Sequence, residues 1–213
     1  MIKKINFLYI FFILLGFIFP IIIVGLKLSN FILLFLWTIF FYCLVIYSLK
    51  HKFNFNNNIY STIKQHKKYI FFIILRWILA SIFLFFFTKL LFPEKLFLIQ
   101  KNSDNLIYKI FLFYPILSAL PQEFIFCTFF FSRYKNLFKS KKSMIFMSSI
   151  IFCFAHIFVI NWIAPLLGYI GGLIFAQTYM RTKSLFLVTV EHSLYGNTLF
   201  FLGLGWFFWG GSV

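Results

Sequence analysis

Long apolar runs dominate this sequence and constrain its fold more than any other feature. A helix needs about 20 mostly apolar residues to cross the roughly 30 Å hydrocarbon core of a bilayer. Seven segments reach or approach that length: residues 5–26, 31–49, 69–88, 106–132, 144–160, 163–180 and 185–201, the last followed by an apolar aromatic tail to Trp209. The pattern predicts an all-α fold, a polytopic transmembrane helix bundle with about seven spans.

Two of these segments need comment. Lys3 and Lys4 precede the first apolar run, as they would in a secretory signal, but the run is too long and ends at Lys27 without a small-residue cleavage site. We therefore expect a retained anchor span. The fourth segment is over-long and contains Pro115 and Pro121. It predicts a helix that is kinked or broken near residues 118–121, with Pro121 opening a fresh helical stretch.

Composition supports the membrane assignment. The chain of 213 residues is 62% apolar and 11% charged, whereas a soluble domain is usually about a quarter charged. Too little polar surface remains to cover a water-soluble globule, so a cytosolic or secreted fold is excluded. The three cysteines are an odd count within apolar runs, which argues against a disulfide framework.

The basic residues indicate orientation. The net charge is +16, and 14 of the 20 lysines and arginines lie in the N-terminus and in the alternate connections at 50–68, 133–142 and 181–183, against three in the opposite connections. By the positive-inside rule this predicts a cytoplasmic N-terminus and an outside C-terminus. The lipid bilayer, with its anionic headgroups, is the expected partner of this charge, and we expect no nucleic-acid binding because no soluble part exists to present a reading surface.

Four of the eight acids and histidines fall within the predicted spans: Glu123, His156, Glu191 and His192. Such a group at mid-bilayer costs about 2.5–3.5 kcal/mol or more, so it is a candidate functional residue. At about 1.5 Å rise per residue, Glu123, His156 and His192 lie roughly 12–18 Å from their basic cytoplasmic flanks. Three helices therefore bring a carboxylate and two imidazoles to one layer of the bundle.

These groups suit two kinds of hydrolytic chemistry, and the residues alone leave both open. A carboxylate and two histidines are suitable zinc ligands, and three protein ligands plus a water form the catalytic zinc pattern. Without a metal, Glu123 would act as the base and a histidine as its electrostatic partner. Either reaction needs water, so we expect these helices to line a wet cavity.

Four stretches carry a family resemblance: PQEFIFCTFFFSRY (121–134), FCFAH (152–156), GGLIFAQTYMRTKSL (171–185) and VEHSLYGN (190–197). In order and spacing they resemble the motifs EExxxR, FxxxH and HxxxN of the CAAX protease and bacteriocin-processing (CPBP, or Abi) family of intramembrane proteases. The resemblance implies a protease core over residues 106–213, preceded by N-terminal spans and a polar cytoplasmic loop in residues 1–105, within one membrane domain.

The motif positions map onto this sequence with departures. Glu123 matches the second glutamate of the first motif, while Gln122 takes the place of the first glutamate and Cys127 that of the arginine. His156 and His192 match the histidines of the second and third motifs. The last motif position falls on Gly196, with Asn197 one residue late.

The resemblance also implies roles. Glu123 and His156 would activate the water, and His192 would stabilise the oxyanion, with Asn197 and Gln122 as further donors. Glu191 would orient a histidine or face another side. The depth of Arg76 in the third span, rather than the resemblance, suggests that it supplies the cation missing at Cys127; alternatively its side chain extends to the cytoplasmic interface.

The leading hypothesis is an intramembrane endopeptidase that cleaves a membrane-associated peptide or protein substrate, in a multi-pass protein of a bacterial cytoplasmic membrane, since the Phe-, Ile-, Lys- and Asn-heavy usage is typical of AT-rich genomes. Two alternatives remain. Gln122, Cys127 and the displaced Asn197 would also suit an inactive relative that binds peptide or protein partners. A small proton-coupled transporter could use the glutamate and histidines as a proton relay.

Overall fold

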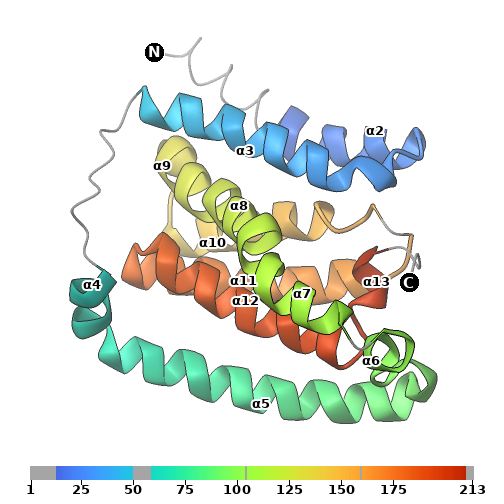
Figure 1. The fold of residues 1–213 in the computed structure, drawn as a ribbon. Coiled ribbons are helices and arrows are strands. Elements are labelled where there is room, and N and C mark those ends of the chain that lie inside the picture. Colours follow the sequence, from blue (N-terminus) through green and yellow to red (C-terminus); the bar gives the residue numbers. More distant parts are fainter. Residues whose placement is uncertain (1–12, 50–58, 104, 159, 210–213) are drawn as a thin grey trace.

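The computed structural model describes residues 13–49, 59–103, 105–158 and 160–209. Every regular element within these ranges is helical, which confirms the all-α prediction. Figure 1 shows the arrangement: an N-terminal hairpin lies along one side, a long oblique helix and three central helices lie in the middle, and α5 runs along the opposite side.

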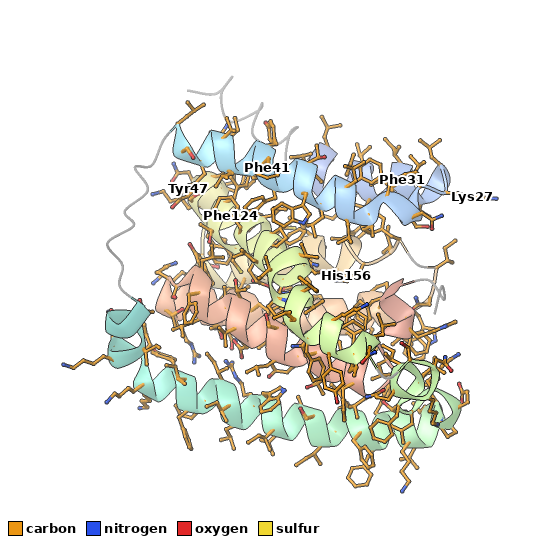
Figure 2. All side chains as sticks on the ribbon, viewed as in Figure 1. Lys27, Phe31, Phe41, Tyr47, Phe124 and His156 are labelled. Carbon is orange, nitrogen blue, oxygen red and sulfur yellow. The ribbon has the colours of Figure 1, made fainter. Side chains whose placement is uncertain are left out.

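The N-terminal hairpin (residues 14–48) consists of π-helix η1 (Leu14–Ile18), α2 (Phe19–Gly25), the 3-10 turn η2 (Ser29–Phe31) and α3 (Ile32–Ser48). It rests on the middle of the bundle through aromatic contacts. The rings of Phe40 and Tyr47 on α3 lie 5.2 and 5.7 Å from that of Phe124. Figure 2 labels Tyr47 and Phe124 where the hairpin meets the long helix. Most of the outward side of α3 is exposed and apolar, as expected for a surface that faces lipid.

The next elements are α4 (Ile59–Gln65), α5 (Lys67–Leu91), the short turn η3 (Pro93–Lys95) and α6 (Leu98–Asn102). The described part of the predicted polar loop at 50–68 thus includes a short helix, and residues 50–58 lie outside the described ranges. α5 packs against α12. Trp77 of α5 donates to Thr198 Oγ1 at 2.9 Å, so a polar contact fixes the register of the two helices.

The fourth predicted span is one continuous helical stretch, Leu106–Leu137, and the expected break is wrong. It runs through α7 (Leu106–Tyr114), η4 (Pro115–Ala119), α8 (Leu120–Glu123), η5 (Phe124–Phe129), α9 (Phe130–Tyr134) and η6 (Lys135–Leu137). Both η4 and η5 are π-helical. A wider turn accommodates a proline without ending the helix, so the irregularity lies where the prolines predict it but the chain stays helical.

The central helices are α10 (Lys141–Phe154), α11 (Ile163–Thr182) and α12 (Leu185–Phe201), followed by α13 (Trp206–Trp209). Ser140 and Ser143 form a capping box that begins α10, and Ser184 caps α12 through the Leu187 amide. α10 ends at Phe154, before His156. The prediction of a helix over 144–160 is therefore wrong at its C-terminal end, and His156 lies in the following turn.

Four described helices are long and apolar enough to span a membrane: Ser29–Ser48, Lys67–Leu91, Leu106–Leu137 and Ile163–Thr182. They confirm a polytopic membrane bundle. α10 and α12 are shorter, and Leu14–Gly25 is a shorter apolar helix; residues 1–12 of the first predicted span lie outside the described ranges. Seven crossings and the orientation of the chain stay predictions.

Candidate active site

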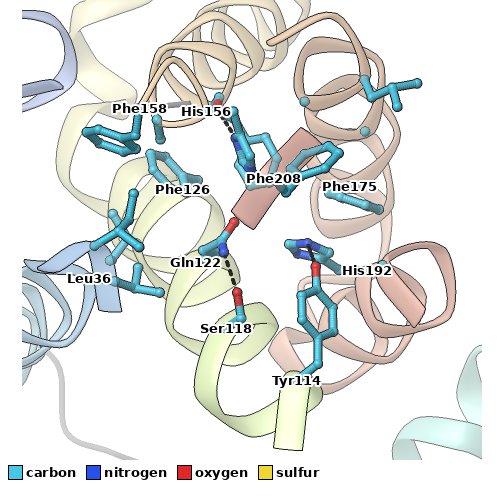
Figure 3. A pocket seen from close by; sticks show the side chains of 18 of the residues that line it. Leu36, Tyr114, Ser118, Gln122, Phe126, His156, Phe158, Phe175, His192 and Phe208 are labelled. Carbon is cyan, nitrogen blue, oxygen red and sulfur yellow. Dashed lines mark hydrogen bonds between the residues drawn. The ribbon is translucent and has the colours of Figure 1, made fainter. Parts of the chain in front are cut away.

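A cavity of about 1150 Å³ lies between the N-terminal hairpin, the long helix Leu106–Leu137 and the central helices. Most of its lining is aliphatic or aromatic, but Tyr114, Gln122, His156 and His192 point into one common space (Figure 3). Among the described residues that line it, none is an aspartate or a glutamate. The polar end of this cavity is the candidate site.

The carboxylate of the site lies behind the cavity wall. Glu123, at the end of α8, is fully buried, and its Oε1 lies 2.8 Å from Nδ1 of His192 on α12. The thiol of Cys127, one turn later, donates to the other oxygen, Oε2, at 3.2 Å. Glu123 therefore contacts His192 rather than His156, and it does not line the cavity as predicted. Cys127 stands at the position of the motif arginine, and its thiol contacts the carboxylate oxygen that the absence of an arginine would leave without a partner.

His192 is held on both nitrogens and on one face. Its Nε2 lies 2.9 Å from the hydroxyl of Tyr114, and the ring of Phe175 stacks on it with centroids 4.5 Å apart. With Glu123 ionised, Nδ1 must carry the proton that the carboxylate accepts. Nε2 is then an acceptor, and the Tyr114 hydroxyl donates to it. This assigns the tautomer that presents a lone pair on the cavity side.

His156 reaches the cavity from the turn after α10. Its Nδ1 lies 2.7 Å from the carbonyl oxygen of Phe152, so Nδ1 carries a proton and Nε2 is left as the second polar atom of the ring. Gly168 of α11 makes room for this ring, because a Cβ at that position would lie 3.1 Å from Nδ1. The imidazole is thus fixed by one backbone contact and by the absence of a side chain opposite it.

Gln122 lies on the cavity side of α8, one residue from the buried Glu123. Its amide nitrogen donates to Ser118 Oγ at 2.8 Å. Its Oε1 is buried and has no hydrogen-bond partner among the described residues. An unpaired buried acceptor is costly, so this oxygen is a position where a ligand donor or a water would be stabilised.

Glu191 points away from the candidate site. Consecutive helical positions differ by about 100°, so Glu191 faces α5 while its neighbour His192 faces the cavity. Arg76 of α5 donates to Glu191 Oε1 at 2.8 Å and to Thr178 Oγ1 at 2.9 Å. The prediction that Arg76 supplies a cation to Glu123 is wrong, since this guanidinium serves Glu191 instead, and Glu191 does not orient a histidine.

Asn197 also lies outside the site. It does not line the cavity, whereas Gly196, its predecessor, does. Its Oδ1 is buried and lacks a hydrogen-bond partner among the described residues. The displacement by one residue rotates this side chain by about 100° away from the last motif position, so Asn197 does not contribute the predicted oxyanion donor.

The side chains do not form the predicted zinc site. Within the described ranges, no three His, Cys, Asp or Glu side chains are grouped so that they could hold a metal ion. Glu123 and His192 direct their polar atoms at each other, and each is also bound by a further residue, Cys127 or Tyr114. A catalytic zinc needs three protein ligands directed at one point, and Glu123, His156 and His192 do not offer that arrangement.

Comparison with known proteins gives the same assignment as the motifs. Residues 104–198 match the model of the Rce1-like family, described as type II CAAX prenyl endopeptidase Rce1-like. This stretch, just under half of the chain, is similar to that family. The match confirms the resemblance to the CPBP proteases over the part of the chain that holds Gln122, Glu123, His156 and His192. No curated protein and no solved structure matches the chain.

The Rce1-like stretch also contains site residues that the sequence did not reveal. Tyr114 and Ser118 precede the first motif on the same long helix, Tyr114 just before the π-turn η4 and Ser118 within it, and both line the cavity. Neither carries a signal in sequence, because a tyrosine or serine in an apolar helix is common. Gly196 is a signal in the sequence that another residue enters the site, because a glycine at a motif position leaves space for a side chain from elsewhere.

Proposed function

We propose that this protein is an intramembrane endopeptidase that hydrolyses a peptide bond close to a membrane-associated segment. The pair of Glu123 and His192 carries the proposal. A buried carboxylate bound to one imidazole nitrogen orients the ring, fixes its tautomer and presents the other nitrogen toward a cavity. The Rce1-like match over residues 104–198 supports the same reaction class.

In this reaction His192 is the general base for water, and Glu123 stabilises the imidazolium that forms. The roles thus differ from the motif-based expectation, in which Glu123 itself acts on water. His156 and Gln122 line the same space as His192 (Figure 3). The amide nitrogen of Gln122 gives one N–H to Ser118 and has a second that is available to a substrate carbonyl, and stabilisation of the developing oxyanion is a large contribution in acyl transfer. Nε2 of His156 is an acceptor, because Nδ1 carries the proton, so it suits a substrate N–H or the water.

The cavity also indicates the kind of substrate. Its walls are mostly apolar, and the N-terminal hairpin forms one of them with residues such as Leu36 (Figure 3). An apolar cavity within a membrane bundle accommodates the hydrophobic part of a lipid-anchored or otherwise membrane-associated peptide. We infer that this part binds along the hairpin wall and places the scissile bond at the polar end.

The test is cleavage of quenched fluorescent peptides that carry a lipid-anchored or hydrophobic segment, by the purified protein in proteoliposomes. Glu123→Gln and His192→Gln should each lower kcat about 100-fold or more, as loss of general-base catalysis does. Glu94→Gln, which changes an exposed carboxylate in η3, is the matched control and should cleave as the unaltered protein does. Cleavage that persists in both site variants would contradict the assignment.

The same assay addresses the metal. Because the side chains do not form a three-ligand site, the proposed reaction uses no metal, and cleavage should be unchanged after treatment with a chelator. Activity that is lost with chelator and restored by zinc would overturn this part of the proposal.

One observation favours a second candidate, a relative that binds peptides without cleaving them. The cavity lining has Gln122, which cannot take a proton, and no carboxylate among its described residues. Gln122→Glu discriminates between the two. A large gain of cleavage over an inert parent would favour the binding protein, whereas a parent that cleaves as fast as the variant would exclude it.

A further inference from the structure

The ring of Tyr114 occupies the space beside Gly196 that a side chain at position 196 would fill. The third motif would place a side chain four residues after His192, on the same face of α12, but the residue there is Gly196. A Cβ on Gly196 would lie 2.2 Å from Cε1 of Tyr114 and 2.4 Å from its hydroxyl oxygen. The tyrosine ring therefore fills the space that a side chain at 196 would need, and the two cannot coexist without a shift.

The ring is fixed so that its hydroxyl meets His192. Tyr114 is the last residue of α7 and precedes the π-turn η4. Its ring packs edge-on against Phe200, with centroids 5.4 Å apart, and against the His192 imidazole at 5.8 Å. The hydroxyl lies 2.9 Å from Nε2, and both residues line the cavity (Figure 3).

This contact has a chemical consequence for the base. Nε2 of His192 is the only lone pair the ring can offer, because Nδ1 faces Glu123. In the structure that lone pair accepts from Tyr114. A water in the cavity therefore meets the tyrosine oxygen, and its proton has a path to His192 through that oxygen.

We propose that Tyr114 is a catalytic residue that passes a proton between the attacking water and Nε2 of His192. The proposal rests on the proposed endopeptidase function. The water O–H bond breaks as a new O–H bond forms on the tyrosine, and the original tyrosine O–H bond breaks as N–H forms on Nε2. The resulting hydroxide attacks the peptide carbonyl, and the reverse transfer returns the proton to the leaving amine.

The relay also explains how one residue serves two stages. After the transfer, His192 is a donor at Nε2 and the tyrosine oxygen accepts from it. The new O–H of Tyr114 then points to the attacking oxygen, which is now a hydroxyl group of the tetrahedral intermediate. The transferred proton therefore stays beside the intermediate until it returns to the leaving amine.

The experiment measures kcat and KM with the same peptide in proteoliposomes. Tyr114→Phe keeps the ring on Gly196 and Phe200 and removes only the hydroxyl, so kcat should fall about 100-fold while KM changes little. Tyr108→Phe, which removes an exposed hydroxyl from the same helix, is the matched control and should leave both constants unchanged. A Tyr114→Phe protein that keeps kcat within about threefold would overturn the proposal.

A second pair of variants guards against a folding defect. Gly196→Asn alone should lose activity, because its side chain collides with the tyrosine ring. Tyr114→Ala combined with Gly196→Asn relieves the collision but also lacks the relay hydroxyl, so its kcat should stay within about threefold of that of Tyr114→Phe. Recovery of cleavage toward the rate of the unaltered protein, in a double variant shown to be helical by circular dichroism, would also overturn the proposal. If the unaltered protein cleaves no peptide, the proposed function fails instead, and the two failures are thereby distinguished.

Discussion

Two neighbouring residues of α12 pair with different helices, so a shift of one position changes the partner of a side chain. Glu191 and His192 are adjacent in sequence, yet one pairs with Arg76 of α5 and the other with Glu123 of α8. The sequence places four acids and histidines inside the membrane helices and so predicts that they are costly and need partners. It does not predict which group pairs with which, because that depends on the rotation of each helix about its axis.

The Arg76–Glu191 pair gives a prediction about stability. Glu191 is fully buried, so removal of Arg76 leaves its charge without a partner. Arg76→Leu should lower the free energy of unfolding by about 3–5 kcal/mol, seen as a lower midpoint in thermal unfolding in detergent. Arg181→Leu, which changes an exposed arginine on α11, is the control and should have little effect.

A second variant makes that result interpretable. Arg76→Leu combined with Glu191→Leu removes both charges, and replacement of a buried pair by apolar residues is often neutral or stabilising. The double variant should therefore unfold at or above the midpoint of the unaltered protein. A double variant as unstable as Arg76→Leu would show that the ion pair is not the cause.

At the level of elements, the apolar pattern predicts where helices lie better than where they end. α12 begins and ends at the predicted residues, since Ser184 caps its start. α10 ends at Phe154 although the apolar run continues through Ile160, and no glycine or proline marks the end. The position of His156 in a turn therefore could not be read from the sequence. The same holds for the π-turn that brings Tyr114 to the cavity.

Close packing of α10 on α11 positions His156, and it yields a prediction. A Cβ on Gly172 would lie 3.0 Å from Cα of Ser149 and 3.1 Å from Cβ of Phe152. Gly172→Ala must push the two helices apart, so it should lower the free energy of unfolding by about 1–3 kcal/mol, the usual cost of overpacking. Thermal unfolding measures this.

The chain provides a matched control at Gly25 of α2. A Cβ at that position would meet no atom within 4 Å, so Gly25→Ala makes the same chemical change without a collision. It should leave the unfolding midpoint unchanged. If both variants unfold at the same temperature, the helix contact at Gly172 is not tight in the way the structure indicates.

For the molecule as a whole, the N-terminal hairpin is a wall of the cavity rather than a separate anchor. Its residues line the apolar part of the cavity, and Trp37 of α3 donates from Nε1 to the Leu117 carbonyl oxygen at 3.0 Å. That carbonyl belongs to the π-turn η4. The sequence predicts the hairpin as two spans, but it does not predict that these spans cover the site, because their apolar faces carry no distinguishing pattern.

The labelling rate of Cys43 measures how tightly the hairpin packs on the long helix. It lies on α3, lines the cavity and is 1% exposed. Trp37→Phe removes one bond between the hairpin and the long helix, so Cys43 should react with a small maleimide several times faster, in a chain whose other cysteines are replaced by serine. Trp162→Phe, at an exposed tryptophan before α11, is the control. Equal labelling rates in both variants would show that Trp37 does not hold the hairpin in place.

The burial of Glu123 has a consequence for the course of the proposed reaction. Its oxygens are enclosed by His192 and Cys127 and do not reach the cavity. A substrate therefore cannot form an anhydride with this carboxylate. In the proposed reaction, water then attacks the peptide directly, both fragments of the cut chain form at the same rate, and no acylated protein accumulates during turnover.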